Sequence, residues 1–541
     1  MDRLSGMSKA ILHDILAKLP DKDAAKTIVL SKTWRDTWYS FPNLSVRSEY
    51  FFTEDDVPQE NSHSFSKLDN LIDYVTKRLV RLRDQGLAIK EFKLNLVDLV
   101  DPTPVSHHLD QWIQMASESG VKVLELYLSA DAGVWYDLPL CVMDAKSLTK
   151  LELGEGIRIG KEFLKHSMKL SSVKMLSLSH VLFAHQGVVE HLISRCPLTE
   201  HLTVDHCSVY NHLSTEGRLE SLFLHGLQKL MEVDLAGIQE VHIDSKNLEK
   251  LLYEPLNFKA PFKLNFDSCR NLRCLQLLHL QSATIVDKWF LELFSKYPFL
   301  ESLKLSDCSM SERINISSAQ LKVLELMFCS NLKEVNIDAP NLLSFDYGGA
   351  DKPVISFMRS SDQLEVKAIT IVELQQLCSS LRVFIRNIPQ KILASLSLFI
   401  VPSFFIFPPF HDYDFPYLPE LQVSSTPPSI KHLDVRVHSD PNHEALYGPL
   451  MNHLLSTCFP KTVSFVYGGR YSFIEFFYDM LMGSKKRECH CSSSDTECWW
   501  HALKIVKISC SFITNQNIDF KAMLDAWPMS SDAKTTFTLE L

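Results

Sequence analysis

Five side chains that commonly bind metals gather near the C-terminal end of the sequence: Cys489, His490, Cys491, Cys498 and His501. Thiolate and imidazole groups close the tetrahedral zinc sites of proteins. The spacing here is a C-x-C pair followed by C-x-x-H, without the paired C-x-x-C knuckles of structural zinc sites, and a run of serines separates the halves. We therefore interpret the segment as a loop with one buried cysteine, and we expect no metal and no other cofactor.

Three glycines, Gly154, Gly156 and Gly160, come closest to a nucleotide-binding fingerprint. The last glycine stands one residue later than a dinucleotide-binding loop requires, so the stretch is better explained as a turn. The sequence also contains no G-x-S-x-G elbow, no phosphate loop ending in Gly-Lys-Ser/Thr and no H-E-x-x-H. We therefore expect a non-catalytic protein.

The composition predicts a folded chain with more than one structural unit or an elongated repeat array. Its 541 residues exceed what one hydrophobic core usually supports, and 46% of them are hydrophobic. The net charge is −10 without a basic stripe, which argues against nucleic acid as a partner. The thirteen cysteines are expected to be small buried hydrophobes rather than disulfides.

Two segments of the sequence indicate whether the protein is secreted or spans a membrane. The N-terminus reaches Asp14 without a long apolar run, so it lacks a secretory signal, and we expect an intracellular protein of the cytoplasm and/or nucleus. Residues 392–410 carry no charge and approach the ~20 residues of a membrane-spanning helix. Pro402, Pro408 and Pro409 break helices, so we expect a buried strand and turn there and no membrane partner.

The first forty residues predict three short helices. Pro20 ends the first, Asp21 is expected to cap the second, and Ser31 is expected to cap the third. Trp34 and Trp38 lie four residues apart on the third helix, so both rings can close one small core. The apolar stripe of the first helix, predicted over residues 8–19, consists of Ile11, Leu12, Ile15, Leu16 and Leu19. Such a small unit buries little surface, so a partner is expected to complete it.

These residues strongly resemble the plant F-box over residues 2–42. The matching blocks are Asp2-Arg3-Leu4-Ser5, Ile11-Leu12-His13-Asp14-Ile15-Leu16, Leu19-Pro20, Lys22-Asp23-Ala24-Ala25 and Val29-Leu30-Ser31-Lys32-Thr33-Trp34-Arg35. The resemblance implies binding to a Skp-type adaptor and, through it, to a cullin scaffold and a RING subunit. The residues expected at the adaptor interface are Leu4, Met7, Ile11, Leu12, Ile15, Leu16, Leu19, Pro20, Val29 and Leu30.

The sequence departs from the family pattern at one place. Gly6-Met7-Ser8 stands where the family has Leu-Pro ahead of the first helix, so a proline that docks on the adaptor is missing.

After this module, an apolar helical stripe predicts a helix that bridges to the next region. That stripe consists of Leu68, Leu71, Ile72, Val75, Leu79 and Leu82.

A strand pattern then recurs, with apolar residues at positions i, i+3 and i+5. Copies that start at Leu300 and Leu321 continue to Cys308 and Cys329 in the order L-x-x-L-x-L-x-x-C. This order resembles leucine-rich repeats, in which the last two leucines point into the solenoid and the thiol lies under the turn. Further copies start at Ile89, Val121, Leu148, Val173, Leu219, Leu272 and Leu332, and a damaged copy keeps Leu202, Val204 and Cys207.

The predicted fold is therefore α/β: an N-terminal three-helix F-box followed by an irregular leucine-rich-repeat solenoid (horseshoe). Alternate strand residues are expected to face outward on a concave sheet and to form a protein-binding surface. The outward residues predicted to include substrate contacts are Glu125, Tyr127, His201, Asp205, Phe223, His225, Lys304, Glu325, Met327 and Asp346.

Beyond Gly348-Gly349 the spacing persists in two copies, which start at Ile430 and Leu503, so the sheet is expected to continue. The block from Cys498 to Ile508 resembles the C-terminal FBD-type segment of plant F-box repeat proteins, which implies a cap or an extension of the binding surface. The predicted domains are 1–45 F-box, 46–88 linker and bridging helix, 89–350 leucine-rich repeats, and 351–541 repeat-like extension with the FBD-like segment near 485–541.

Two functions follow from this organisation. The first is a substrate-recognition subunit of a Skp-cullin-F-box ubiquitin ligase, which binds the adaptor through the F-box and an unknown protein substrate through the repeats. The alternative is a repeat-based interaction scaffold whose F-box no longer recruits a ligase, because of Gly6-Met7 in place of Leu-Pro.

Overall fold

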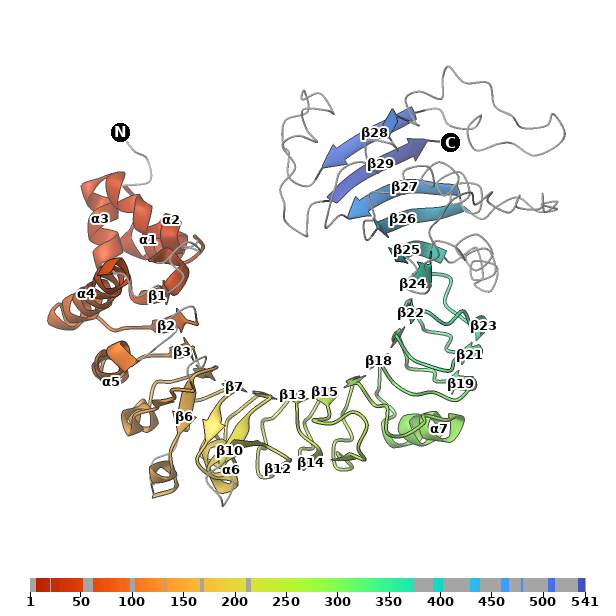
Figure 1. Cartoon of the computed structure of the whole chain (residues 1–541), viewed down its shortest axis with the longest axis horizontal. Coiled ribbons are helices and arrows are strands. Elements are labelled where there is room, and N and C mark those ends of the chain that lie inside the picture. The colour runs from red at the N-terminus through yellow and green to blue at the C-terminus, as the bar shows by residue number, and fades with distance from the viewer. Residues whose placement is uncertain are drawn as a thin grey trace, which may run out of the picture. The chain divides into compact units, whose positions relative to one another are not determined.

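The structure is a computed structural model of the chain, shown in Figure 1. Contacts divide it into two compact units, Met1–Leu278 and His279–Leu541, and each is described by itself. The described residues are 6–19, 21–51, 62–97, 103–129, 133–165, 170–210, 216–373, 393–401, 429–437, 459–466, 478–479, 505–510 and 534–540.

The first unit begins with the three predicted helices: α1 (Lys9–Leu16), α2 (Asp21–Lys26), which runs into a 3-10 turn (Thr27–Val29), and α3 (Lys32–Tyr39). Two serines cap them, since Ser8 Oγ accepts from the Ile11 amide at 3.5 Å and Ser31 Oγ accepts from the Trp34 amide at 3.3 Å. Ser31 was the predicted cap. The first helix ends at Leu16, three residues before the predicted Leu19.

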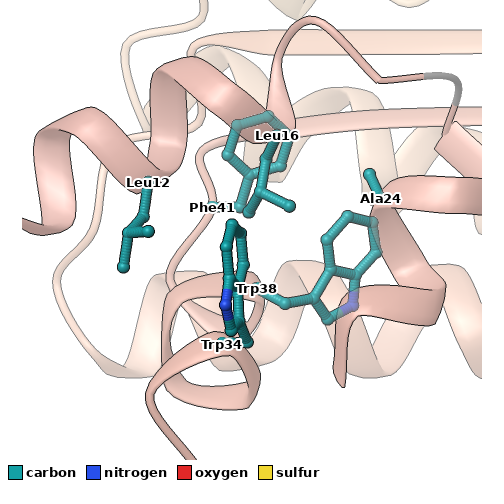
Figure 2. Packing of buried hydrophobic residues seen from close by; sticks show 6 residues of the cluster. All are labelled: Leu12, Leu16, Ala24, Trp34, Trp38 and Phe41. Atoms are coloured by element: carbon teal, nitrogen blue, oxygen red, sulfur yellow. The ribbon is translucent and has the colours of Figure 1, made fainter. Parts of the chain in front are cut away.

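A single hydrophobic cluster holds these helices together (Figure 2). Trp34 is 2% exposed and Trp38 is 6% exposed, which confirms the prediction that both indoles lie inside. The other buried members are Leu12, Leu16, Ala24 and Phe41. A cluster of six residues is small, so the module depends on each large side chain for its stability.

A long helix, α4 (Ser62–Asp84), joins the module to the repeats, as the apolar stripe predicted. Leu71, Val75, Leu79 and Leu82 of this stripe are buried. Between them lies Arg78, which is 4% exposed. Its guanidinium donates to the Trp38 carbonyl at 2.8 Å and to the Phe41 carbonyl at 3.2 Å, and its carbon lies 4.7 Å from the centre of the Trp38 ring. Arg78 thereby fixes the end of α3 to the bridging helix.

A parallel main sheet forms the rest of the first unit. Its strands pair in the order β1-β2-β3-β5-β7-β9-β13-β15-β17. The bounds are β1 (Asn43–Arg47), β2 (Glu91–Leu96), β3 (Val123–Leu128), β5 (Lys150–Leu153), β7 (Met175–Ser179), β9 (His201–Asp205), β13 (Glu232–Ala236), β15 (Lys250–Glu254) and β17 (Cys274–Leu278). The buried apolar residues of each strand lie opposite those of the neighbouring strand, as in Leu94 opposite Leu126. The sheet begins at β1, directly after the F-box and ahead of the predicted first copy at Ile89.

Helices and shorter strands connect the main strands. Helices α5 (Thr103–Glu118) and α6 (Gln186–Ser194) precede β3 and β9. The shorter strands form one sheet of β4 (Tyr136–Asp137), β6 (Ile157–Ile159), β8 (Leu182–Phe183), β10 (Ser208–Tyr210) and β11 (Glu216–Arg218), and another of β12 (Ser221–Leu224), β14 (Glu240–Ile243) and β16 (Lys263–Asn265). Gly156, with φ +76°, makes the turn from β5 to β6, so the glycine segment is a turn as predicted.

The repeat copy predicted at Leu219 does not belong to the main sheet. Its strand is β12, which pairs with β14 and not with a main-sheet strand. The main-sheet strands of this stretch are β13 and β15, whose buried residues include Leu235 and Tyr253. Both sheets bury apolar side chains against the same interior, so the i, i+3, i+5 spacing alone does not identify the sheet.

The second unit repeats this organisation. After α7 (Asp287–Lys296), its main sheet pairs in the order β18-β20-β22-β24-β25-β26-β27-β29-β28, and β19, β21 and β23 form a side sheet. The main-sheet bounds are β18 (Ser302–Ser306), β20 (Val323–Met327), β22 (Ser344–Gly349), β24 (Glu365–Glu373), β25 (Leu393–Val401), β26 (Ser429–Val437), β27 (Phe459–Val466), β29 (Lys534–Glu540) and β28 (Ile505–Cys510). The side-sheet bounds are β19 (Arg313–Ser317), β21 (Glu334–Asp338) and β23 (Val354–Arg359).

The predicted continuation of the sheet is confirmed, because β24 to β28 extend it and the buried Ile430, Leu433 and Val435 lie on β26. The copy at Leu332 is on the side sheet, in β21, and the next main strand, β22, buries Phe345 and Tyr347. Strand β29 runs antiparallel between β27 and β28, which interrupts the parallel array (Figure 1).

The predicted burial of the repeat thiols is confirmed at Cys207, Cys308 and Cys329. Cys207 is buried and its Sγ donates to the Leu178 carbonyl at 3.3 Å, while the Cys329 Sγ lies 3.5 Å from the Leu305 carbonyl. Each bond reaches back to the preceding main strand, so the cysteines tie successive repeats together. The free cysteines among the described residues are Cys141, Cys196, Cys207, Cys269, Cys274, Cys308 and Cys329.

A cysteine–histidine cluster and an uncharged segment are among the predicted features that fall partly or wholly outside the described residues. The cluster Cys489, His490, Cys491, Cys498 and His501 lies outside them entirely. Of the uncharged segment 392–410, residues 393–401 form strand β25, as expected for a strand, and the rest lies outside. Among the residues that the structure describes, no helix is both long and apolar enough to cross a membrane.

Candidate functional site

Exposed apolar side chains concentrate on the F-box. Within residues 6–30, Met7, Ile11, Leu19, Val29 and Leu30 are all exposed, and Val29 is 85% and Leu30 60% accessible. Single exposed apolar residues are ordinary, whereas a concentration of large ones on a small module is typical of an interaction surface. These five belong to the predicted adaptor-binding set.

The structure corrects that set at two positions. Leu12 and Leu16 are 1% exposed and pack in the cluster with both indoles, so they support the fold and offer no contact surface (Figure 2). Ile15 is half-buried at the edge of the same cluster. Leu4 and Pro20 lie outside the described residues. The apolar stripe on α1 is broad, and only its packing against α3 shows which edge remains accessible.

His13 connects α1 to the end of α3. Its Nε2 lies 3.2 Å from the Thr37 carbonyl and 3.3 Å from Ser40 Oγ, and its ring centre lies 5.6 Å from that of Phe41. Burial lowers the pKa of His13 and outweighs the opposing effect of the bond to Thr37, so the folded module favours the neutral imidazole. His13 is therefore part of the polar support of the module.

The second candidate site is the outward face of the main sheet in the first unit, where charged residues of β2, β3 and β5 form a continuous network. Lys93 Nζ lies 3.1 Å from Glu91 and 3.5 Å from Glu125. Lys150 Nζ lies 2.6 Å from Glu125 and 2.7 Å from Glu152. Opposite charges on neighbouring strands thus form ion pairs, which hold the charged side chains of this face in place.

Tyr127, an outward residue of β3, lies flat across the next strand. A Cβ at Gly154 would fall on the Tyr127 ring, so only glycine there lets the ring lie flat. The hydroxyl donates to Glu152. Burial by itself raises the pKa of Glu152, but hydrogen bonds from Lys150 and Tyr127 outweigh it and hold the pKa below its usual range. Burial and the bond to Glu152 raise the pKa of Tyr127, which therefore keeps its proton.

A hollow of about 410 Å³ lies beside this network. Its lining includes Ala17 and Leu19 from the F-box side and Lys93, Glu125 and Glu152 from the sheet. Because its charged groups already form ion pairs, the hollow suits binding of a side chain or loop more than catalysis.

Farther along the sheet the charges are less balanced. His201 Nδ1 lies 3.3 Å from Glu232, which also lies 3.7 Å from Lys250. Asp234 is half-buried on β13 and, among the residues that the structure describes, forms no hydrogen bond or ion pair. Burial, reinforced by the nearby Asp205, raises the pKa of Asp234 and outweighs the opposing effect of Lys250. This carboxylate is therefore incompletely compensated within the unit.

In the second unit, three of the four predicted outward residues occupy one row. Lys304, Glu325 and Asp346 lie opposite one another on β18, β20 and β22, and Lys304 Nζ lies 3.0 Å from Glu325. Met327 lies over Gly348, where a Cβ would fall on its thioether, as Tyr127 does over Gly154. The two units therefore use the same glycine device for a large outward side chain.

Phe223 and His225 were predicted on the concave sheet, and this prediction is wrong. Phe223 lies on β12 and His225 directly follows that strand, in the sheet of β12, β14 and β16. There Phe223 stacks on His225 at 6.5 Å and on His242 at 5.0 Å between ring centres. The physical cause is the same as for the copy at Leu219: strands of both sheets bury apolar side chains at the same spacing, so the sequence pattern assigned these residues to the main sheet.

Sequence reasoning missed Lys93, Lys150, Glu152 and Asp234. The signal for the first three was present, because they flank apolar residues of copies already identified at Ile89 and Leu148. Asp234 follows from the copy Leu230-x-x-Val233-x-Leu235, which has the same spacing. What the sequence does not contain is the register that brings Lys150 beside Glu125.

Two family models match the chain. The model described as "F-box domain" matches residues 4–45, and the model described as "At1g61320/AtMIF1, LRR domain" matches residues 82–268 and 255–426. The second match alone covers more than half of the chain. The boundaries agree with the three-helix module and with main sheets in both units.

Curated relatives carry the same combination. The chain is 29% identical over 258 residues to the F-box/FBD/LRR-repeat protein At1g13570 of Arabidopsis thaliana, covering 46% of this chain and 56% of that protein. It is 29% identical over 210 residues to the F-box/LRR-repeat protein At2g42720 of the same plant, covering 38% and 44%. The chain spans about half the length of the curated relatives it matches. With the capped three-helix module, the parallel repeat sheets and these matches together, the chain belongs to the plant F-box proteins with a leucine-rich-repeat domain.

Proposed function

We propose that this protein is the substrate-recognition subunit of a Skp-cullin-F-box ubiquitin ligase. The F-box binds a Skp-type adaptor, which connects it to a cullin and a RING subunit, and the outward face of the repeats binds the protein to be ubiquitinated. The protein itself carries out no chemistry in this role.

The observation that carries the proposal is the exposed apolar surface of the F-box. The module buries a small core of its own, yet it leaves Met7, Ile11, Leu19, Val29 and Leu30 accessible. Burying each large aliphatic side chain at an interface contributes about 1.5 to 3 kcal/mol. A few such side chains are sufficient for a specific interface with the adaptor.

The test is affinity capture with the intact chain and with a variant lacking residues 6–42, both under proteasome inhibition. The intact chain is expected to recover the adaptor, the cullin and substrates, whereas the variant is expected to recover substrates alone. Quantitative mass spectrometry of both samples separates the two groups. Recovery of no adaptor by the intact chain at cellular concentrations would overturn the proposal.

The alternative is an interaction scaffold without a ligase, and one observation favours it: Gly6-Met7 stands in place of Leu-Pro. In that case, Gly6→Leu with Met7→Pro should create adaptor binding that the native chain lacks. Equal binding by the native and substituted chains would reject the alternative. Met7 is 41% exposed, which is consistent with an apolar contact at this position in the native chain.

For the substrate surface, we propose a partner segment that carries lysine or arginine. Asp234 supports this, because its half-buried carboxylate forms no hydrogen bond or ion pair among the described residues. The negative charges of Asp205 and Glu254 act on it together with the positive charge of Lys250, which offsets them only in part. A cationic side chain from a partner would compensate this negative charge where the unit itself does not.

Asp234→Asn is therefore expected to weaken substrate binding about tenfold, as expected for loss of one charge-assisted hydrogen bond. Adaptor recovery in the capture experiment should stay unchanged, because the F-box is intact. Asp362→Asn is the matched control, since Asp362 is an exposed aspartate in the turn before β24. If both variants recovered the same substrates as the native chain, Asp234 would have no role in substrate binding.

A further inference from the structure

Two histidines and an aspartate converge at the ends of β7 and β9. His180 and His206 directly follow these strands, and Asp205 is the last residue of β9. One potential ligand atom from each of the three lies within 4.8 Å of the other two. His180 Nδ1 lies 3.8 Å from the Asp205 carboxylate, and His206 Nδ1 lies 2.6 Å from it.

The two imidazoles are held face to face. Their ring centres lie 5.7 Å apart with an angle of 15° between the planes. Both residues have positive φ, 58° for His180 and 45° for His206, so each is in the left-handed conformation that most side chains avoid. This conformation directs both rings toward Asp205, on a backbone fixed by hydrogen bonds from the His180 amide to Asp205 and from the His206 amide to Ala236, at 2.8 and 2.9 Å.

Neighbouring residues support the His206 ring. Gly237 follows β13 at the equivalent position, with φ 74°, and a Cβ there would lie 3.0 Å from the His206 ring. The glycine therefore lets the next repeat pack directly against the imidazole. Arg218 donates to the His206 carbonyl at 3.4 Å, away from the ring nitrogens. The two contacts hold the backbone of His206 and leave both of its ring nitrogens available.

We propose that His180, Asp205 and His206 bind one divalent transition-metal ion of the zinc class. Two imidazoles and one carboxylate are ligands that zinc accepts, at about 2 Å from each donor atom, and three protein ligands leave a fourth position open. The ion replaces the histidine–carboxylate contacts as the link between the repeats of β7 and β9. Asp205 faces outward on the main sheet, so the open position lies at the edge of the proposed substrate surface and is available to water or to a partner side chain.

The test uses the full chain, stripped with a chelator and titrated with Zn²⁺ alone against a chromophoric competitor. A background with Cys489→Ser, Cys491→Ser and Cys498→Ser removes the thiols of the C-terminal cluster. In this background one ion is expected to bind, and His180→Asn or His206→Asn is expected to weaken binding at least about tenfold, since the loss of even an outer contact costs about 10- to 100-fold. Asparagine tolerates the left-handed conformation, so these variants keep the backbone.

His279→Asn is the matched control. His279 has the same turn conformation, with φ 56°, and pairs with Asp307 at 3.7 Å, but it is not part of a three-ligand group among the described residues. Its replacement should leave Zn²⁺ binding unchanged. Titration of Co²⁺ alone, followed by its visible absorption, reports whether nitrogen ligands bind the ion, and this signal should disappear with His206→Asn. Absence of Zn²⁺ binding in the serine background, or equal affinity of the native and both asparagine chains, overturns the proposal.

Discussion

Trp34→Ala is expected to unfold the F-box while the repeats remain folded. Trp34 is 2% exposed and is one of two tryptophans in a cluster that has six buried members among the described residues. Truncating a buried tryptophan costs about 3 to 5 kcal/mol, which is comparable with the whole stability of a small module. Hydrogen exchange followed by mass spectrometry should show loss of protection in residues 9–39 and native protection in the main-sheet strands.

The control for this variant is Arg35→Ala, because Arg35 is the exposed neighbour of Trp34 on α3. Its replacement is expected to change stability by about 0.5 kcal/mol or less, as for most surface positions. Native protection of α1 and α3 in the Trp34→Ala chain would show that the indole is not essential to the module. Loss of protection throughout the chain would instead show that the F-box and the repeats unfold together through α4.

The double variant Val29→Asp and Leu30→Asp is expected to abolish adaptor binding without unfolding the F-box. The two side chains are 85% and 60% exposed, so charged groups at these positions remain in water in the free chain. At an interface, however, the variant loses two aliphatic contacts of about 1.5 to 3 kcal/mol each and buries two carboxylates. We expect Kd for the purified adaptor to rise at least about a hundredfold, which corresponds to about 2.8 kcal/mol.

Calorimetric titration of adaptor into the full chain measures this change, and hydrogen exchange of the F-box confirms that the fold is retained. Leu198→Asp is the matched control, because Leu198 is also an exposed leucine, 43% accessible, but lies between α6 and β9 outside the F-box. Unchanged adaptor affinity in the double variant would remove Val29 and Leu30 from the interface. An equal loss with Leu198→Asp would point to a general effect of added charge.

Local sequence determined the elements of both regions. Ser31 caps α3 because its side chain accepts from the amide three residues later, and the i, i+4 spacing of Trp34 and Trp38 places both rings on one side of that helix. The i, i+3, i+5 spacing likewise identified buried strand residues such as Leu303 and Leu305, because strand alternation sends them to one side of the sheet. These features depend on residues close in sequence.

Only the tertiary structure decided how those elements are used. Leu12 and Ile11 are adjacent on the apolar stripe of α1, but packing against α3 buries the first and leaves the second 48% exposed. The copies at Leu219 and Leu332 joined side sheets, because both sheets bury apolar residues against one interior.

The candidate sites depend on the same information. Tyr127 lies over Gly154, and His180 meets Asp205, because parallel register places equivalent positions of successive repeats side by side. These partners are about 25 residues apart in the chain, and the length of each connecting segment varies from repeat to repeat. The sequence thus specifies which side chains face outward or inward, whereas the pairing of strands determines which of them meet.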